Sequence, residues 1–482
     1  MNNVAWKSIG IDKYKNFDEW YHSVLREADI VDIRYPVKGM IVWKPYGLKA
    51  LRLVQRILIS LLEETGHQEA YYPTLIPESI FSKEKDFLQG FGGETLVIEG
   101  TASKRFSERY FLRPTSETVM YYMWSLWIKG RKDLPLKIYQ VVNVFRYETK
   151  MTHPILRVRE IMSFIEAHTA HASMEEAEKQ IAEAIEVYKK FFDRLYLPYF
   201  IVKTPPWDTF AGAEYNYDFI TVMPDGKGLE LGSVINLGQR FARAFDIKFM
   251  DSDGSVKYVY QTCYGVSERV LGAVIAIHGD EKGLFFPPEV APIQIVIVPI
   301  AKPEDRDVLE YAKSVKTYLE RNNMRVLLDD DPEHTPGWKY YYWEMKGVPL
   351  RLEIGRKELD TRTVTIAKRD GSPKVTVKLE DLVNTIQQVS LELGESIRSR
   401  ALEHLKKLTR LYLDCSFHEN FRGLVIAPWD GSRGDAERLE ETYKMSVLGE
   451  IVESPIDLPN PKNFTTCSGS RADRFALLGT TY

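Results

Sequence analysis

The spacing of apolar residues predicts helices and strands along the first 290 residues. Between Gly47 and Glu64 the apolar positions recur at helical intervals and form one stripe, made of Leu48, Leu51, Val54, Ile57, Leu58, Leu61 and Leu62. Ser173 and Glu176 form a capping box, which predicts a second amphipathic helix to about Leu195. A further helix is expected after Pro114, with Thr115 or Ser116 as its cap. Strand-like runs occupy residues 69–77, 137–147, 157–166, 219–223, 245–249 and 257–261. This order predicts an α+β domain in which helices cover a mostly antiparallel sheet.

The pattern changes near residue 290, where prolines bracket a linker. Residues 294–300 are a continuous apolar run, typical of a strand buried on both faces. A helix over 304–322 and strands over 324–328 and 349–354 complete a βαβ unit. A basic helix follows, and it carries Arg398, Arg400, Lys406, Lys407 and Arg410. We therefore predict three domains: residues 1–290, an α/β domain over 291–390, and a small α/β appendage with the basic helix over 391–482.

Composition limits the classes of protein to which the chain can belong. It has 482 residues, 44% apolar and 27% charged, which is typical of a folded soluble protein. The net charge of −4 excludes binding of nucleic acid by bulk positive charge alone. No apolar run approaches the roughly 20 residues of a membrane span, and residues 1–7 do not resemble a signal peptide. Three scattered cysteines are too few for a disulfide framework, so we expect a reducing compartment and a cytoplasmic protein without a membrane partner.

Arginines provide the strongest candidate chemistry. Arg146 and Arg157 occupy neighbouring strand-like segments, and a hairpin between them would present two planar cations to a polyanion such as a phosphate chain. Arg269, at the start of an apolar helix, could supply a third. The alternative is structural, because Glu148, Glu160 and Glu268 could pair with these arginines.

The order of these segments resembles the three motifs of class II aminoacyl-tRNA synthetases. The surrounding sequence is similar to prolyl-tRNA synthetases of the archaeal/eukaryotic type over essentially the whole chain. The segments that carry this resemblance are Arg113-Pro-Thr-Ser-Glu-Thr118, Asp133-Leu-Pro135, Gly212-Ala-Glu-Tyr215, Met223-Pro-Asp-Gly226, Gln261-Thr-Cys-Tyr-Gly265, His278-Gly-Asp280 and Lys346-Gly-Val-Pro-Leu-Arg351.

The resemblance implies ATP-dependent activation of proline and its transfer to the 3′ end of tRNA by a homodimer, with Mg²⁺ on the pyrophosphate. It implies catalytic roles for Arg146 and Arg269. The implied ATP-binding residues are Arg146, Glu148, Arg157, Glu230, Ser233 and Arg269. The implied amino-acid-binding residues are Thr115, Glu117, Arg146, Phe164, Phe210 and Ile235. In the second domain, an anticodon-binding domain by resemblance, the implied tRNA contacts are Pro336, Gly337, Lys339 and Glu344.

Four positions near the implied pocket depart from the family pattern. The family usually has an acid where Ile220 stands, an amide at Glu230, a threonine at Ser233 and a histidine at Ile235. Loss of polar groups changes which substrate a closed site accepts. An alternative is therefore a diverged paralogue that activates another small amino or imino acid, or an inhibitor-insensitive duplicate. A third interpretation is a non-catalytic tRNA-binding module.

The remaining departures concern tRNA and zinc. Asp331 stands where the family usually has an arginine, which should remove about one salt-sensitive phosphate contact. Trp338 and the tyrosines at 340–342 could stack on unpaired bases or pack inside the domain. Many relatives hold zinc with four cysteines in the C-terminal appendage, whereas here one cysteine, Cys467, occupies the matching region. We expect no structural zinc, no metal-ligating residues and an appendage of undefined role.

Overall fold

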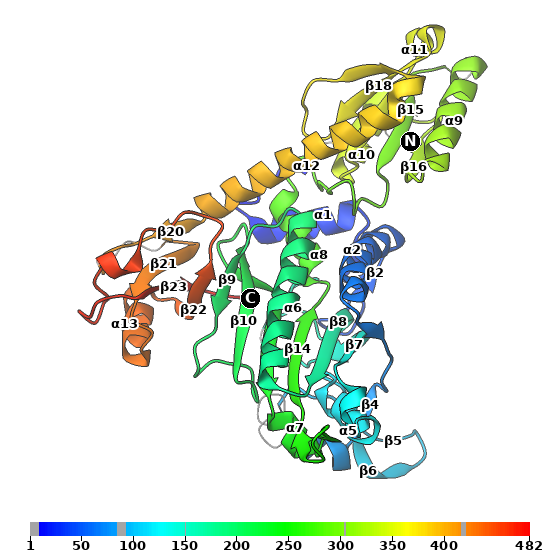
Figure 1. Cartoon of the computed structure of the whole chain (residues 1–482). Coiled ribbons are helices and arrows are strands. Elements are labelled where there is room, and N and C mark those ends of the chain that lie inside the picture. Colours follow the sequence, from blue (N-terminus) through cyan, green and yellow to red (C-terminus); the bar gives the residue numbers. More distant parts are fainter. Residues whose placement is uncertain (1–8, 84–92, 150, 303–304, 416–420) are drawn as a thin grey trace.

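A computed structural model describes residues 9–83, 93–149, 151–302, 305–415 and 421–482. Figure 1 shows three bodies of secondary structure, with the long helix α12 (Leu382–Lys407) running from the upper body to the one at the left. Across the described residues, every helix is too short or too polar to span a membrane. Lys150 and Glu304, the latter at the expected start of the helix over 304–322, lie outside the described residues.

An 11-stranded sheet is the main framework, and its central strands are antiparallel, as predicted. The strands at the two edges pair in parallel with their neighbours, β3 with β7 and β20 with β21. In spatial order the strands are β20 (Thr409–Leu411), β21 (Leu424–Trp429), β23 (Arg474–Gly479), β22 (Ser446–Glu453), β9 (Phe200–Lys203), β10 (Tyr215–Val222), β11 (Gly228–Gly238), β14 (Tyr260–Val266), β8 (Glu160–His171), β7 (Leu136–Phe145) and β3 (Gln68–Glu69).

Two long amphipathic helices, α2 (Pro45–Glu64) and α6 (Met174–Arg194), share a core with this sheet. The predicted stripe of α2 is buried except for the half-buried Leu48, and each buried leucine contributes about 1.5–3 kcal/mol. Ser173 caps α6 as expected, because its hydroxyl accepts the Glu176 N–H. The reciprocal bond of the predicted capping box is displaced by one residue, because the Glu176 carboxylate accepts the N–H of Ala172 rather than that of Ser173. The other helices of this region are α1 (Phe17–Glu27), α3 (Glu78–Phe81), α5 (Glu117–Trp127), α7 (Arg240–Phe245) and α8 (Arg269–His278).

Three small sheets complete the region, and one of them corrects a prediction. The strand expected over residues 245–249 is wrong at its start, because Phe245 ends α7 and Asp246 adopts a left-handed conformation. The chain becomes extended two residues later. The small sheets are formed by β1 (Val31–Asp32) with β2 (Val42–Trp43), β12 (Lys248–Met250) with β13 (Val256–Tyr258), and β4 (Leu75–Pro77), β6 (Arg105–Leu112) and β5 (Val97–Gly100).

The upper body in Figure 1 contains the predicted βαβ unit. Strand β15 (Ile295–Pro299) is fully buried and pairs in parallel with β16 (Val326–Leu328) and β17 (Leu350–Ile354). The antiparallel strands β18 (Thr363–Lys368) and β19 (Val375–Lys378) extend the sheet, and helices α9 (Arg306–Arg321), α10 (Pro336–Met345) and α11 (Arg356–Thr361) connect its strands. The first half of α12 packs into the same core, so the boundary expected at 390–391 falls inside one helix.

The C-terminal residues form a body that shares a sheet with the rest of the chain. Helix α13 (Arg433–Tyr443) packs against β21 and β22, and β22 pairs with β9, where Ile451 lies opposite Val202. The sequence predicted a separate appendage. Its strands instead continue the large sheet, a pairing between distant segments that local periodicity cannot reveal.

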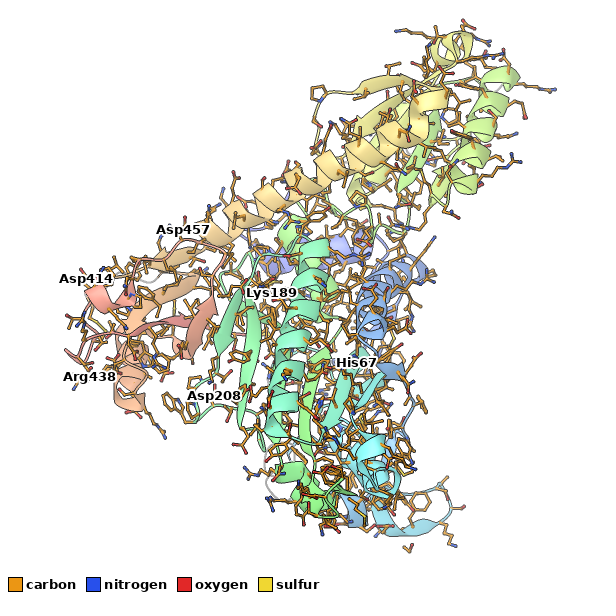
Figure 2. All side chains as sticks on the ribbon, in the orientation of Figure 1. His67, Lys189, Asp208, Asp414, Arg438 and Asp457 are labelled. Atoms are coloured by element: carbon orange, nitrogen blue, oxygen red, sulfur yellow. A yellow bond between two sulfur atoms is a disulfide. The ribbon has the colours of Figure 1, made fainter. Side chains whose placement is uncertain are left out.

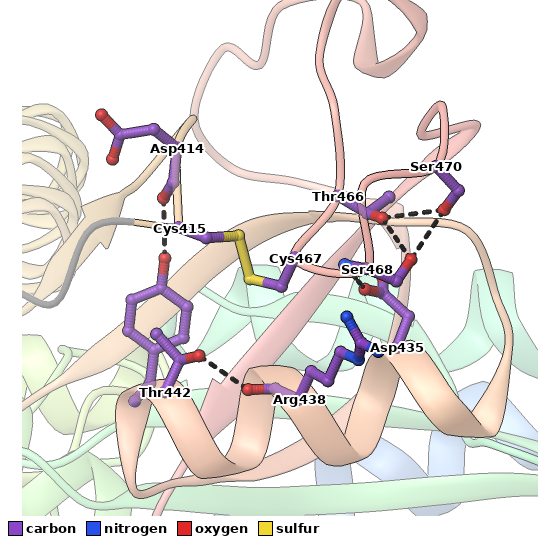
Figure 3. Close-up of a disulfide and its surroundings, with 10 residues drawn as sticks. Asp414, Cys415, Asp435, Arg438, Thr442, Thr466, Cys467, Ser468 and Ser470 are labelled. Atoms are coloured by element: carbon purple, nitrogen blue, oxygen red, sulfur yellow. Dashed lines mark hydrogen bonds between the residues drawn. A yellow bond between two sulfur atoms is a disulfide. The ribbon is translucent and has the colours of Figure 1, made fainter.

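A disulfide joins Cys415 to Cys467, with 5.4 Å between their Cα atoms (Figure 3). The sequence analysis took three scattered cysteines as too few for a disulfide framework and did not anticipate this bond. Strand β20 runs parallel to β21 and β23 runs antiparallel to it, so the end of β20 and the start of β23 lie at the same end of the sheet. Cys415 follows the first and Cys467 precedes the second. The inference of a reducing compartment therefore loses its support from cysteine usage.

Candidate functional site

A cavity of about 450 Å³ lies against strands β8, β10, β11 and β14. Nine of the residues implied by sequence line it: Thr115, Glu117, Arg146, Phe164, Phe210, Glu230, Ser233, Ile235 and Arg269. They lie on α5, β8, β11 and α8 and in the loops that follow β6, β7 and β9, so the fold gathers residues as far apart as Thr115 and Arg269. Asp208, another lining residue, is labelled in Figure 2 on the side of the sheet that faces the C-terminal body.

Two arginines border the cavity together. Arg146 follows β7, and its Nε donates to the Pro114 carbonyl at 3.0 Å. Arg269 begins α8, and its Nε donates to the Leu156 carbonyl at 3.0 Å. Burial lowers the pKa of Arg146, and the charge of Arg269 lowers that pKa further. Two cations that repel each other across one cavity form a site suited to an anion.

Arg157 and Glu148 lie outside the lining residues and bind each other. The Arg157 guanidinium contacts Glu148 Oε2 at 2.7 and 2.8 Å, which is the structural pairing considered as the alternative for these arginines. The other two carboxylates make different contacts. Glu160 accepts from Asn143, and Glu268 accepts the backbone N–H groups of residues 162 and 163.

Buried carboxylates occupy one end of the cavity. Glu117 begins α5, and it accepts a hydrogen bond from the Thr115 hydroxyl. Glu166, which the sequence analysis missed, lies beside it on β8 and accepts hydrogen bonds from Ser116 and Gln140. Of the two predicted caps of α5, Ser116 occupies the cap position. Its hydroxyl binds Glu166 and makes no capping bond.

The pKa values of these two carboxyls are shifted in opposite directions. Burial raises the pKa of Glu117, and the charge of Glu166 contributes to the same shift. For Glu166, burial also favours the protonated form, but the contact with His168 and the bonds from Ser116 and Gln140 outweigh it and lower the pKa. The negative charge is therefore better stabilised on Glu166 than on Glu117. A cation placed between them would favour the charged form of Glu117.

Two of the positions that depart from the family, Glu230 and Ser233, belong to a polar cluster around Asp218. The carboxylate of Asp218 accepts hydrogen bonds from Thr204 at 2.7 Å, Ser233 at 2.6 Å and Asn216 at 3.0 Å. Burial raises its pKa to about 6, and the negative charge of Glu230 adds to the shift. Ser233 thus has a partner that explains its presence.

Ile235 lies in a row of three neighbouring side chains on adjacent strands. It pairs with Cys263 on β14, which in turn pairs with His168 on β8, and all three line the cavity. A histidine is therefore present two strands away from the position where the family usually has one. The Arg146 guanidinium lies 5.7 Å from the centre of the Phe164 ring, on another side of the same cavity.

Thr481 and Tyr482 also line the cavity, although no local sequence pattern pointed to them. The Tyr482 hydroxyl donates to Asp225 at 2.9 Å, and the Lys227 ammonium lies 4.6 Å from the centre of its ring. The C-terminal body thus contributes directly to the site.

The implied tRNA-binding residues lie at α10. Pro336 and Gly337 form its first turn, and Glu344 near its end pairs with Arg351 at 3.1 Å. Lys339 is 4% exposed and binds Asp329, so it is the least accessible of the four. The aromatic residues show one of the two roles considered, packing inside the domain: Trp338 stacks on Tyr342, and Tyr340 packs at the edge of a core. Tyr341 is exposed, and stacking on bases stays a prediction. Asp331 binds His334.

Comparisons with known proteins agree with this architecture. A model of the tRNA synthetase class II core domain (G, H, P, S and T) matches residues 100–278, and an anticodon binding domain model matches 294–389. The proline–tRNA ligase of Ignicoccus hospitalis is 46% identical, with 93% of this chain and 94% of the relative covered. That of Pyrococcus horikoshii is 44% identical, with 97% and 98% covered.

Solved structures show the same similarity. Giardia lamblia prolyl-tRNA synthetase in complex with prolyl-adenylate matches with a TM-score of 0.92 and 33% identity, covering 98% of this chain and 100% of that chain. The Cryptosporidium parvum enzyme complexed with halofuginone and AMPPNP matches with a TM-score of 0.91 and 28% identity, covering 98% and 99%.

Proposed function

The chain belongs to the proline–tRNA ligases, a family of class II aminoacyl-tRNA synthetases, and we propose that it performs both steps of their reaction in the cavity described above. In the first step the carboxylate of proline attacks the α-phosphorus of ATP, and the bond to pyrophosphate breaks. In the second step a hydroxyl of the terminal tRNA ribose attacks the acyl carbon, and AMP leaves. The protein positions the reactants and stabilises charge, because neither step requires a protein nucleophile.

A single observation carries this assignment: buried carboxylates and two arginines line the same cavity. A zwitterionic amino acid needs partners of both charges. Glu117 and Thr115 would accept the hydrogens of the proline ammonium, and Arg146 would bind its carboxylate and the α-phosphate. Phe164 and Phe210 would enclose the apolar ring.

Arg269 would neutralise the outer phosphates of ATP. Arg157 and Glu148 would support the nucleotide as a bound pair, because Glu148 already holds the guanidinium in place. Glu230 fits a role in binding Mg²⁺: it is exposed at the cavity, it offers carboxylate oxygens, and its backbone carbonyl accepts from Arg269. Bound Mg²⁺ would offset charge on the departing pyrophosphate.

Proline is the favoured substrate despite the departures at Ile220, Glu230, Ser233 and Ile235. Relatives that cover nearly the whole chain at 44–46% identity are named proline–tRNA ligases, which argues against the paralogue alternative. The non-catalytic alternative would leave a buried carboxylate pair facing two arginines without a purpose.

The remaining proposals concern partners and location. The anticodon-binding model over residues 294–389 supports tRNA as the partner of the upper body in Figure 1. The tRNA would bind near Pro336, Gly337, Lys339 and Glu344. We further propose a homodimer in the cytoplasm, on the basis of the class II family and its role in translation.

The test is ATP–pyrophosphate exchange with each of the twenty amino acids, followed by charging of a tRNA transcript with the proline anticodon. Exchange should depend on proline alone, and Arg146→Ala should abolish it. Arg26→Ala is the matched control, because Arg26 is exposed on α1 and pairs with Glu27. Exchange driven by a different amino acid would overturn the substrate, and absence of exchange with all twenty would overturn the activity.

A further inference from the structure

The carboxylate end of the cavity also contains a thiol and an imidazole. Glu117 at the start of α5, His168 on β8 and Cys263 on β14 place one potential ligand atom each within 4.8 Å of the others. All three side chains are at most 4% exposed, and all three line the cavity. No sequence motif announces this group, because its members come from three separated segments.

We propose that Glu117, His168 and Cys263 form a binding site for a thiophilic divalent cation such as Zn²⁺, and that this cation competes with proline. The binding half of the proposal stands on the three ligands alone. The competition half rests on the proposed function, in which Glu117 holds the amine of proline.

The donor set is that of a zinc site with an open position. Thiolate, imidazole and carboxylate bind Zn²⁺ at about 2.0–2.3 Å, which in a tetrahedral site separates ligand atoms by about 3.3–3.8 Å. The observed upper limit of 4.8 Å requires movements of about 1 Å, within the range of side-chain rotation. The cavity itself lies on the fourth side, where water or a solute would complete the coordination.

Neighbouring residues orient two of the ligands. The Tyr121 hydroxyl lies 2.9 Å from His168 Nδ1, so that nitrogen is occupied. Nε2 lies 3.4 Å from Glu166 Oε2 and would exchange that contact for the metal. The Thr115 hydroxyl holds Glu117 Oε2 and leaves the other carboxylate oxygen for coordination. Second contacts of this kind are typical of protein zinc sites.

The charge around the group also favours a cation. Glu117 and Glu166 share the same buried end of the cavity, and both are at most 3% exposed. Proline would bring one positive charge to this end, whereas Zn²⁺ would bring two and displace the thiol proton to solvent. A metal in this position occupies the space that the proline ammonium needs, so the two ligands exclude each other.

Binding is tested with Co²⁺ as the probe, because a tetrahedral cobalt thiolate has intense visible and charge-transfer absorption. The whole chain, freed of metal with a chelator, should acquire these bands with one equivalent of Co²⁺, and added proline should remove them. Cys263→Ser should abolish the charge-transfer band. The double variant Cys415→Ser/Cys467→Ser is the matched control and should retain it, since it lacks the other two cysteines and keeps Cys263. Absence of the band, or its persistence in Cys263→Ser, overturns the proposal.

Competition is tested by proline-dependent exchange at saturating Mg²⁺-ATP. The KM for proline should rise in proportion to free Zn²⁺ while kcat stays constant. Loss of a residue that hydrogen-bonds to a metal ligand costs about 10–100-fold in metal affinity. Because Cys263 would be a ligand itself, Cys263→Ser should weaken the inhibition by Zn²⁺ at least tenfold, measured against that variant's own KM for proline. Inhibition that proline cannot relieve refutes competition. Failure of exchange without Zn²⁺ would refute the proposed function and leave the cobalt spectrum as an independent result.

Discussion

Replacing Glu117 with glutamine separates substrate binding from stability, because the ligand-free site penalises a charge that a bound ammonium would stabilise. Burial raises the pKa of Glu117, and the charge of Glu166 adds to that shift, so the ligand-free site disfavours the charged form relative to the acid. Glutamine has nearly the shape of that acid and no charge. The ligand-free protein should therefore tolerate Glu117→Gln, whereas the bound amino acid loses a negative partner for its ammonium.

The size of the effect follows from the bond removed. A hydrogen bond between charged groups contributes about 1.5–3 kcal/mol, and each 1.36 kcal/mol changes a rate or equilibrium constant tenfold. Glu117→Gln should lower kcat/KM for proline in ATP–pyrophosphate exchange by about 10- to 150-fold, mainly through KM.

The free energy of unfolding should respond in the opposite direction. A carboxyl whose pKa is raised in the folded state reduces stability as pH rises above its unfolded value, and glutamine does not titrate. Urea unfolding near pH 7.5 should therefore find Glu117→Gln at least as stable as the parent protein. Glu166→Gln is the comparison, since Glu166 is the charged acceptor for Ser116 and Gln140, and it should lose about 1–3 kcal/mol of stability. If Glu117→Gln loses stability and keeps its KM for proline, the assignment is refuted.

Three other outcomes are expected. Burial and the charge of Glu230 raise the pKa of Asp218 to about 6, so its contribution to the free energy of unfolding declines as pH rises from about 4 through 6. Asp218→Asn should remove this pH dependence of the free energy of unfolding measured in urea. An unchanged pH dependence would contradict the raised pKa of Asp218. Reduction of the Cys415–Cys467 disulfide, which closes a loop of 52 residues, should lower the free energy of unfolding by about 2–4 kcal/mol, and Cys415→Ser should make unfolding insensitive to reductant. Tyr482→Phe removes the bond to Asp225 and should lower kcat/KM for activation a few-fold, consistent with about 1 kcal/mol; no change in either KM or kcat would show that this bond does not support the site.

Local patterns predicted the parts of the fold that depend on nearby residues. The apolar stripe of α2 and the cap of α6 specify their helices within a few turns, and the apolar run at β15 specifies a buried strand. The order of these elements predicted the antiparallel sheet, and the similarity to class II enzymes, which family models and relatives confirm, supplied the family. That similarity also named nine of the residues that line the cavity.

The rest depended on contacts between segments that are far apart. Glu166 looks like any acidic residue on a strand until Ser116 and Gln140 are seen to surround it. The disulfide required knowledge that β20 and β23 flank β21. The Glu117–His168–Cys263 group likewise exists only after three elements come together. Spacing along the chain contains none of this information.

The pairing of β9 with β22 has a consequence for folding during translation. Lys203 pairs with Glu450, so about 250 residues must be added before β9 acquires its second neighbour. At roughly 5–20 residues per second, a ribosome takes on the order of 12–50 s to make them. During that interval Phe200, Ile201 and Val202, which are at most 1% exposed in the finished fold, form an unprotected apolar border on the nascent sheet. Synthesis of this protein thus includes a period in which chaperones have a defined strand to shield, and a stalled chain would leave that strand open to aggregation.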